Sequence, residues 1–321
     1  MKNTIHKTPG YVPLDYIKGQ IIDHYSSGII YKLMDHLNFG EDINPDTGEV
    51  IEKYGKNGWK KAPYRRASFK NLDFIYYYES KRLCFSGSLH VFYNAINGDG
   101  EHNNNDFGID QFYSVLSTFE SLWGIKPYNI HISQLEWGYN IKHPYSSDSI
   151  IQGCIMHKNV PFKDTFTKTD GTYYVSSKCH YQIKIYNKAL QHKINSKQIL
   201  RIERKQTNYS IYCRKYGIGQ SLQDLIDSNF IGLMDNLIEN WNEIVFFDHT
   251  ITSTNNRITK YNNPVFWVNY SKTRKTKANE IKRMRSNNRK YGRNVQSKIL
   301  ELMIKKQKEL AVVTKINLIY S

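Results

Sequence analysis

Two runs of the chain alternate apolar with polar side chains: Tyr181-Gln182-Ile183-Lys184-Ile185-Tyr186-Asn187-Lys188 and Ile199-Leu200-Arg201-Ile202-Glu203-Arg204-Lys205. This alternation is typical of β-strands with one buried face. In the first run the odd positions are apolar, so the even positions share a polar face that includes Lys184, Tyr186 and Lys188. In the second run the polar face carries Arg201 and Glu203. The two runs predict neighbouring strands that each present a polar face.

A third strand is expected over residues 129–141, where the alternation shifts by one position. Its apolar residues are even-numbered up to Ile132 and odd-numbered from Leu135 onward. One extra residue near Ser133, a β-bulge, would keep all of them on the core side, and bulges are common beside active sites. The same bulge would place His131 and Glu136 together on the polar face.

The rest of the sequence predicts a mixture of strands and helices. Aromatic and β-branched runs indicate strands at 72–78 and 83–93, with His90 packed between strands. Residues 44–48 are typical of a turn between two strands, and the polar segment 97–105 of a loop. Helical periodicity indicates helices over 107–123, 221–247 and 278–312, the last with a possible break at Gly292. The predicted fold class is α+β: an antiparallel β-sheet with helices packed on one face, followed by a helical basic C-terminal region.

Length and composition favour a folded protein. The chain has 321 residues, of which 40% are hydrophobic and 14% aromatic, which excludes a disulfide miniprotein and a wholly disordered chain. No run approaches the roughly 18 apolar residues of a membrane span, and the N-terminus lacks the apolar core of a signal peptide. We therefore expect a cytoplasmic protein with no membrane partner. The four cysteines form no CxxC pair and are expected to be reduced thiols.

Most of the excess positive charge lies near the C-terminus. Residues 272–308 hold 14 basic and two acidic side chains, so they account for +12 of the formal net charge of +16. Such a concentration favours a polyanion as partner, above all nucleic acid, although a solvated helix or a membrane surface would also explain it. The densest group is predicted to contact DNA phosphates: Lys282, Arg283, Arg285, Arg289, Lys290 and Arg293.

The predicted sheet carries the groups that phosphodiester cleavage by a tyrosine requires. Carboxylates and an imidazole can hold a divalent metal ion, here Glu136, Glu203 and His131. The hydroxyl of Tyr186 could attack phosphorus, and a nearby lysine would stabilise the phenolate and the transition state. Each of these residue types alone more often has a structural role, as a packed tyrosine, an ion-paired glutamate or a hydrogen-bonded histidine.

Five segments, in this order, resemble those of rolling-circle replication initiators of the filamentous-phage and small-plasmid type, within the HUH-like tyrosine endonucleases. The resemblance covers about residues 68–206. The segments are Gly87-Ser88-Leu89-His90-Val91-Phe92-Tyr93-Asn94, Glu101-His102-Asn103-Asn104-Asn105-Asp106-Phe107, Leu135-Glu136-Trp137-Gly138-Tyr139-Asn140-Ile141, Ile183-Lys184-Ile185-Tyr186-Asn187-Lys188 and Leu200-Arg201-Ile202-Glu203-Arg204-Lys205.

The resemblance implies an enzyme that nicks one strand of origin DNA, stays linked to the 5′ phosphate through tyrosine, and rejoins the strand. It implies a catalytic neighbourhood of Tyr186, Lys188, Arg201 and Glu203, to which the flanking Lys184 is added, and a Mg²⁺ or Mn²⁺ ion held in part by Glu136. The implied partners are single- and double-stranded origin DNA, with a host helicase and polymerase. The implied domains are a nicking endonuclease over 1–210 and a helical, basic DNA-binding region over 211–321.

Several alternatives stay open at this point. The segment around His131 supplies one histidine where the family has two, and Asn187 and Gln191 stand where relatives have acidic residues. Tyr181 is the leading substitute nucleophile, although its parity places it on the apolar face. His102 and Asn103–Asn105 could contact DNA or simply form a turn. A plasmid mobilisation relaxase and a non-catalytic DNA-binding regulator are the alternative functions.

Overall fold

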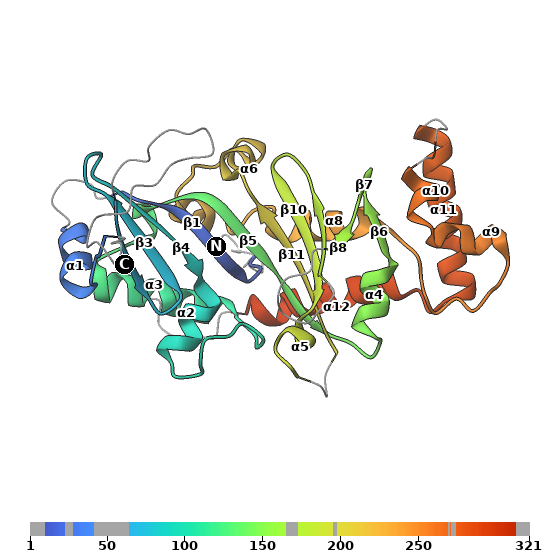
Figure 1. Cartoon of the computed structure of the whole chain (residues 1–321), viewed down its shortest axis with the longest axis horizontal. Coiled ribbons are helices and arrows are strands. Elements are labelled where there is room, and N and C mark those ends of the chain that lie inside the picture. The colour runs from blue at the N-terminus through green and yellow to red at the C-terminus, as the bar shows by residue number, and fades with distance from the viewer. Residues whose placement is uncertain are drawn as a thin grey trace, which may run out of the picture. The chain divides into compact units, whose positions relative to one another are not determined.

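The computed structural model describes residues 10–22, 28–41, 64–164, 173–194, 198–268, 270 and 274–312 (Figure 1). The chain divides into two compact units. Unit 1 consists mainly of Trp137–Lys205 and Gly232–Val312, and unit 2 mainly of Pro13–Glu136 and Gln206–Ile231.

Unit 2 is an antiparallel sheet covered by helices. Its strand order is β2-β3-β4-β1-β5, and strand β5 continues past Glu136 into unit 1. An aromatic cluster around the fully buried Trp123 packs α3 against the sheet, with ring centroids 5.3 Å from Phe74 and 5.4 Å from Phe119. The elements are β1 (Leu14–Ile21), α1 (Ile29–His36), β2 (Arg65–Phe69), β3 (Leu72–Tyr77), β4 (Arg82–Ser88), α2 (Leu89–Ile96), α3 (Ile109–Trp123), η1 (Pro127–Asn129), β5 (Ile130–Lys142), α6 (Tyr209–Tyr216) and α7 (Leu222–Asp227).

Unit 1 continues from β5 in the strand order β5-β11-β10-β9-β8, with a small second sheet in the order β12-β6-β7. The elements are α4 (Ser147–Gly153), β6 (Cys154–His157), β7 (Val160–Pro161), β8 (Lys163–Asp164), β9 (Tyr173–Ser177), β10 (Tyr181–Asn187), α5 (Lys188–Gln191), β11 (Ile199–Gln206), α8 (Leu233–Glu243), β12 (Ile244–Phe246), α9 (Asn256–Thr259), η2 (Lys260–Asn262), α10 (Pro264–Val268), α11 (Arg274–Tyr291) and α12 (Val295–Leu310).

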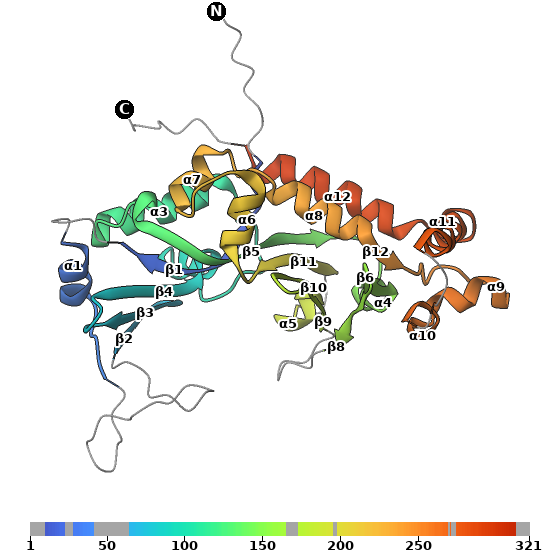
Figure 2. The same ribbon diagram turned by 90° about the horizontal axis from the view of Figure 1, so that it is seen from above.

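One face of the large sheet in unit 1 packs on helix α8, and α12 lies beside α8 (Figure 2). The odd positions of β5 face α8: the Trp137 indole donates a hydrogen bond to the Leu233 carbonyl at 3.0 Å, and the Tyr139 hydroxyl to the Met234 sulfur at 3.3 Å. The Trp241 indole of α8 in turn donates to the Gln296 carbonyl of α12 at 2.9 Å. Burial of this apolar face leaves the even positions of β10 and the odd positions of β11 for the polar face.

The structure confirms the α+β fold class and the strands predicted over residues 72–78, 129–141, 181–186 and 199–205. All six apolar residues of β5 are buried, and between them Ser133 is exposed and Gln134 partly exposed, as a shift in alternation predicts. The predicted turn at 44–48 lies outside the described residues.

Two predicted elements are wrong in part. The strand expected over 83–93 ends at Ser88, whose hydroxyl accepts a hydrogen bond from the Val91 amide at 3.1 Å and caps helix α2. His90 therefore lies on a helix and does not pack between strands. The helix expected over 221–247 is two helices followed by strand β12, because Gly232 has a positive φ of 75° and starts α8 afresh.

The predicted break of the last helix at Gly292 is confirmed. Helix α11 ends at Tyr291 and α12 begins at Val295. A Cβ atom at Gly292 would lie 2.9 Å from the Asn288 carbonyl oxygen and 3.0 Å from the buried Asp248 carboxylate, so this close approach requires glycine. Among the described residues no helix is both long and apolar enough to cross a bilayer.

Candidate active site

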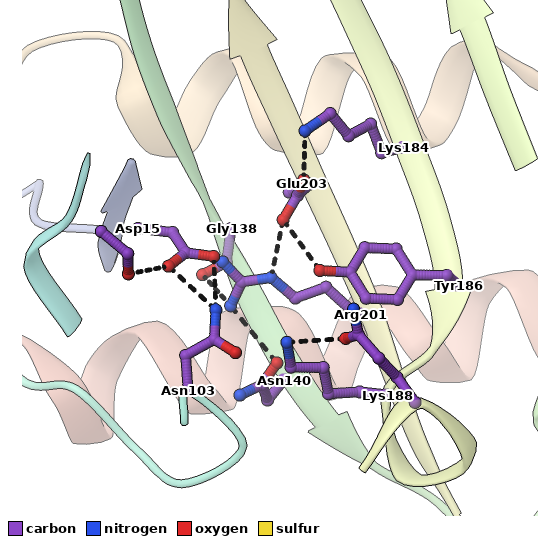
Figure 3. A network of polar contacts seen from close by, with 11 residues as sticks. Asp15, Asn103, Gly138, Asn140, Lys184, Tyr186, Lys188, Arg201 and Glu203 are labelled. Atoms are coloured by element: carbon purple, nitrogen blue, oxygen red, sulfur yellow. Dashed lines mark hydrogen bonds and ion pairs between the residues drawn. The ribbon is translucent and has the colours of Figure 1, made fainter. Parts of the chain in front are cut away.

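The polar face of β10 and β11 brings a phenol, a carboxylate and two cations into contact (Figure 3). The Tyr186 hydroxyl donates to Glu203 Oε2 at 3.3 Å, and Arg201 Nε donates to the same oxygen at 3.0 Å. Lys184 Nζ lies 2.8 Å from the other carboxylate oxygen, Glu203 Oε1. The four residues predicted from strand parity to share one surface do share it.

Strand β5 approaches this group closely from the other side of β11. Arg201 Nη1 donates to the Asn140 side-chain oxygen at 3.3 Å and lies 3.5 Å from the Gly138 carbonyl. A Cβ atom at position 138 would lie 2.2 Å from the Ile202 carbonyl oxygen and 2.6 Å from the Cα atom of Glu203. Glycine at this position therefore allows the backbones to approach and fixes Arg201 against the strand that carries Asn140.

The Tyr186 ring is enclosed by two further residues. The Tyr173 ring of β9 lies 4.9 Å away between centroids, and Lys188 Nζ lies 5.5 Å from the Tyr186 ring centroid. Lys188 is the first residue of helix α5, and its ammonium donates to Gln191 Oε1 at 2.9 Å. Sequence reasoning included Lys188 but missed Tyr173, which no local pattern distinguishes from the other tyrosines of the chain.

The charged groups of this cluster are almost completely buried. Tyr186 is 7% exposed, Glu203 3% and Arg201 1%. A carboxylate removed from water is costly unless cations and hydrogen bonds compensate it, and here Lys184 and Arg201 do so. In such a setting Glu203 accepts the hydrogen bond of the phenol, while the two cations stabilise any negative charge that develops beside it.

Tyr181 lies on the opposite face of β10, as parity predicts. The guanidinium carbon of Arg204 lies 3.8 Å from its ring centroid, and the His157 ring centroid lies 6.0 Å away. Arg204 also donates to Asn240 Oδ1 of helix α8 at 2.9 Å. Tyr181 thus belongs to the side of the sheet that packs on α8, away from Glu203.

The predicted metal ligands are divided between the two units. Glu136 is 7% exposed and Gln134 Nε2 lies 3.4 Å from its Oε1 atom, while the backbone of His131 forms an isolated bridge with Ser221. These residues belong to unit 2 and Glu203 to unit 1. Among the described residues, no three His, Cys, Asp or Glu side chains are grouped so that they could hold a metal ion. The ligand set stays a prediction.

The loop over residues 97–105 is held by polar contacts within unit 2. His90 Nε2 lies 2.6 Å from Asn105 Oδ1, which also accepts from Asn94 Nδ2 at 2.8 Å. Asn103 Nδ2 donates to both carboxylate oxygens of Asp15, at 2.9 and 3.0 Å. These contacts support a structural role for the asparagines. Asp15 was not a sequence-based candidate, because it lies 88 positions from its partner.

The six predicted DNA-contacting residues differ in their surroundings. Arg283 pairs with Glu280 at 2.6 Å. Arg285 and Arg289 line one polar pocket, and Arg293 lines a second pocket that also contains apolar side chains. The remaining two, Lys282 and Lys290, are exposed on α11.

No protein-family model and no curated protein matches this sequence. Among solved structures, the chain is similar to the rolling circle replication initiator protein from Geobacillus stearothermophilus, with 13% sequence identity and a TM-score of 0.39. The alignment covers 75% of this chain and 88% of that one. That protein is of the class that the five sequence segments resemble. At this identity and score the likeness carries no argument about chemistry, which depends on the residues of the site.

Proposed function

We propose that this protein nicks and rejoins one strand of DNA through Tyr186 and thereby starts rolling-circle replication. The observation that supports this most is the contact of the Tyr186 hydroxyl with Glu203, at 3.3 Å, beside Lys184 and Arg201. A phenol needs a base and nearby positive charge before it can attack a phosphodiester, and this cluster contains both.

The proposed reaction is a transesterification that requires no external energy source. The Tyr186 hydroxyl gives its proton to Glu203 as its oxygen bonds to phosphorus. The bond from phosphorus to the 3′ oxygen breaks, and that oxygen takes up a proton to become a free 3′ hydroxyl. The product is a 5′-phosphotyrosine, and attack by a 3′ hydroxyl on it reverses the reaction and rejoins the strand.

Lys184 and Arg201 are proposed to act on charge. Both contact the Glu203 carboxylate, so they also lie beside the phenol oxygen on which negative charge develops. Positive groups held in place before the reaction lower its barrier without the cost of reorganising solvent. Lys188, near the ring of Tyr186, is proposed to help hold the tyrosine in position.

A divalent ion is not well accommodated at Glu203 in this arrangement. Both of its oxygens already accept contacts from Lys184, Arg201 and Tyr186, and a Mg²⁺ or Mn²⁺ ion would have to displace a cation. We therefore assign Glu203 to proton transfer. Glu136 and His131 have the oxygen and nitrogen donors that suit such an ion, and they are proposed to hold Mg²⁺ or Mn²⁺, which would polarise the scissile phosphate.

The basic helices α11 and α12 are proposed to bind the origin, as single- and double-stranded DNA. The free 3′ hydroxyl would then serve a host polymerase, with a host helicase separating the strands. A relaxase would use the same chemistry at a transfer origin, so the DNA element that encodes the chain distinguishes these two functions.

Covalent capture tests the proposal. The full chain is incubated with Mn²⁺ or Mg²⁺ and labelled single-stranded oligonucleotides that tile the encoding element, and adducts are resolved on a denaturing gel. We expect an adduct that falls at least about 1,000-fold in Tyr186→Phe, because the nucleophile is removed. The matched control Tyr181→Phe should keep it.

Two outcomes would overturn the assignment. An adduct that persists in Tyr186→Phe and disappears in Tyr181→Phe would move the nucleophile to the other face of β10. Tight duplex binding with no adduct from any oligonucleotide would favour the non-catalytic regulator. Urea unfolding of both variants shows whether each is folded.

A further inference from the structure

A polar pocket of about 250 Å³ lies where α11 meets the first turn of α12 and the end of α8. Its walls consist of Arg285, Arg289, Ser297 and the carboxamides of three asparagines and one glutamine. Gln296 and Ser297 already donate to other groups of the chain, so the donors available to a ligand belong to Arg285, Arg289 and the asparagines, and no acidic side chain lines the pocket. This donor-rich composition suits an oxyanion.

The two arginines are placed on one side of α11 without a counter-ion. They are four positions apart, so they project from the same face of the helix. Arg285 Nη2 donates a hydrogen bond to the Asn242 carbonyl, and Arg289 Nε donates to the Arg285 carbonyl at 3.4 Å. Within the part of the chain that the structure describes, neither forms an ion pair with a carboxylate. Burial and the nearby charge of Arg289 lower the pKa of Arg285, a cost that a bound anion would relieve.

The carboxamides fix the shape of the pocket. Asn288 Nδ2 donates to the Phe246 carbonyl at 2.7 Å, and Gln296 Nε2 donates to the carbonyls of Trp241 and Ile244 at 3.0 and 3.2 Å. These bonds join α11 and the start of α12 to α8 and β12. Because the walls are held by backbone contacts, the pocket exists before any ligand binds, which lowers the entropic cost of binding.

The start of α12 forms one wall of the pocket. This helix has 16 residues, and its N-cap residue, Asn294, has a φ of 53° and makes no capping hydrogen bond with its side chain. Gln296 and Ser297 of its first turn line the pocket. The Val295 amide of the same turn already donates to Asp248 Oδ2 at 2.9 Å, so this carboxylate compensates the helix terminus and the two guanidinium groups carry the positive charge of the pocket.

We propose that this pocket binds a single phosphate group of DNA through Arg285 and Arg289. The inference deepens the DNA binding that the proposed function includes, but it does not depend on nicking. It divides the basic cluster into one built subsite and a surrounding positive surface. Arg283, which is two residues from Arg285 and paired with Glu280 at 2.6 Å, belongs to the surrounding surface.

Thermal unfolding with inorganic phosphate tests the pocket without DNA. At constant ionic strength, replacing chloride with phosphate should raise the Tm of the full chain, because a ligand of the folded state stabilises it. The rise should disappear in Arg285→Gln and Arg289→Gln and remain in Arg283→Gln. The Tm in chloride shows whether each variant is folded. An equal rise in all four proteins would overturn the proposal.

DNA binding gives the second measurement. With a 20-mer oligonucleotide, Arg285→Gln or Arg289→Gln should weaken binding about tenfold, and each should reduce the slope of log Kd against log salt by about one. The double variant should lose little more than either single variant, because both arginines hold the same phosphate. Arg283→Gln should change Kd less than about twofold. Equal effects of all three single substitutions would indicate diffuse attraction and overturn the subsite.

The same assay identifies the source of the phosphate. If the pocket holds an internal phosphodiester, oligonucleotides with and without a 5′ phosphate should bind equally. If it holds a strand end, the 5′-phosphorylated form should bind more tightly, and Arg285→Gln should abolish the difference. Covalent capture with the unsubstituted chain separates this inference from nicking: failure of that chain to form an adduct, with DNA binding that still depends on Arg285, would remove the proposed function and leave the pocket.

Discussion

Basic side chains meet in two parts of unit 1, with opposite outcomes. In the large sheet, Lys184 contacts one carboxylate oxygen of Glu203 at 2.8 Å and Arg201 contacts the other at 3.0 Å. On α11, Arg285 and Arg289 line a pocket that contains no acid. The first group is compensated by the protein itself, whereas the second is left for an external anion to compensate.

The difference shows how one residue type serves two purposes. A buried guanidinium held by a carboxylate is fixed in position, and so is suited to orient and stabilise neighbouring groups. A half-exposed guanidinium without a carboxylate has donors to offer a ligand. Net charge cannot distinguish these cases. The presence or absence of an acid within about 3 Å can.

The largest effect is expected from breaking the compensated group. Glu203→Ala should lower the free energy of unfolding by about 3–5 kcal/mol, because it removes a carboxylate that contacts the 1%-exposed Arg201. Urea unfolding followed by circular dichroism measures the change. A loss below about 1 kcal/mol would mean that the carboxylate does not compensate Arg201 as the geometry indicates.

A surface ion pair provides the control for this prediction. Glu41→Ala removes the partner of Arg65, whose side chain is 51% exposed, and should cost less than about 1 kcal/mol. The double variant Glu203→Leu/Arg201→Met should be more stable than Glu203→Leu alone, because two apolar side chains leave no buried charge to compensate.

A second prediction concerns two buried histidines, His143 and His157, whose uncharged form is favoured by burial. Burial lowers the pKa of His143 and of His157 from 6.5 to about 4; at His157 the neighbouring Glu243 partly opposes the shift. Below pH 6.5 the unfolded chain takes up protons that these folded histidines do not. Stability due to each is therefore present above pH 6.5 and falls as the pH drops toward about 4, by up to about 3 kcal/mol per histidine.

Substitution isolates the contribution of one histidine. In His157→Gln the side chain can still hydrogen-bond to Glu243, and the stability difference between pH 7 and pH 4.5 should shrink relative to the unsubstituted chain. The exposed His249→Gln serves as control and should leave that difference unchanged. An unaltered pH dependence in His157→Gln would show that His157 is already charged in the folded protein.

The smallest effect is expected from freeing two cations near the basic helix α11. Glu280→Gln removes the acid that pairs with Arg283 and Lys260 while keeping an acceptor for the Tyr261 hydroxyl, which lies 2.7 Å away. Freeing these cations should tighten DNA binding about twofold to threefold, with a steeper salt dependence. Fluorescence anisotropy across a salt series measures both the Kd and its salt dependence. Weaker binding in this variant would mean that the ion pair helps to present the helix to DNA.

Much of the candidate active site follows from sequence alone. A strand alternates its side chains with a period of two, so residues 184 and 186 had to share a face, as did residues 201 and 203. The same rule placed Tyr181 on the other face. It could not show that Tyr173 packs on Tyr186, because no strand was predicted at β9 and the register of the β9–β10 pair places the two residues opposite each other. Helix α2 was mistaken for a strand because its aromatic residues suit either state until Ser88 caps it.

Neighbouring positions along the chain decide which side chains share a strand face and where positive charge accumulates, so both can be predicted without a structure. Contacts between elements needed the tertiary structure. Arg283 meets Glu280 three positions earlier on its own helix, a pair that sequence spacing can predict, whereas Arg285 meets the end of α8 and Lys184 of β10 meets Glu203 of β11. The last two partners are set by packing between separate elements, which no local pattern encodes.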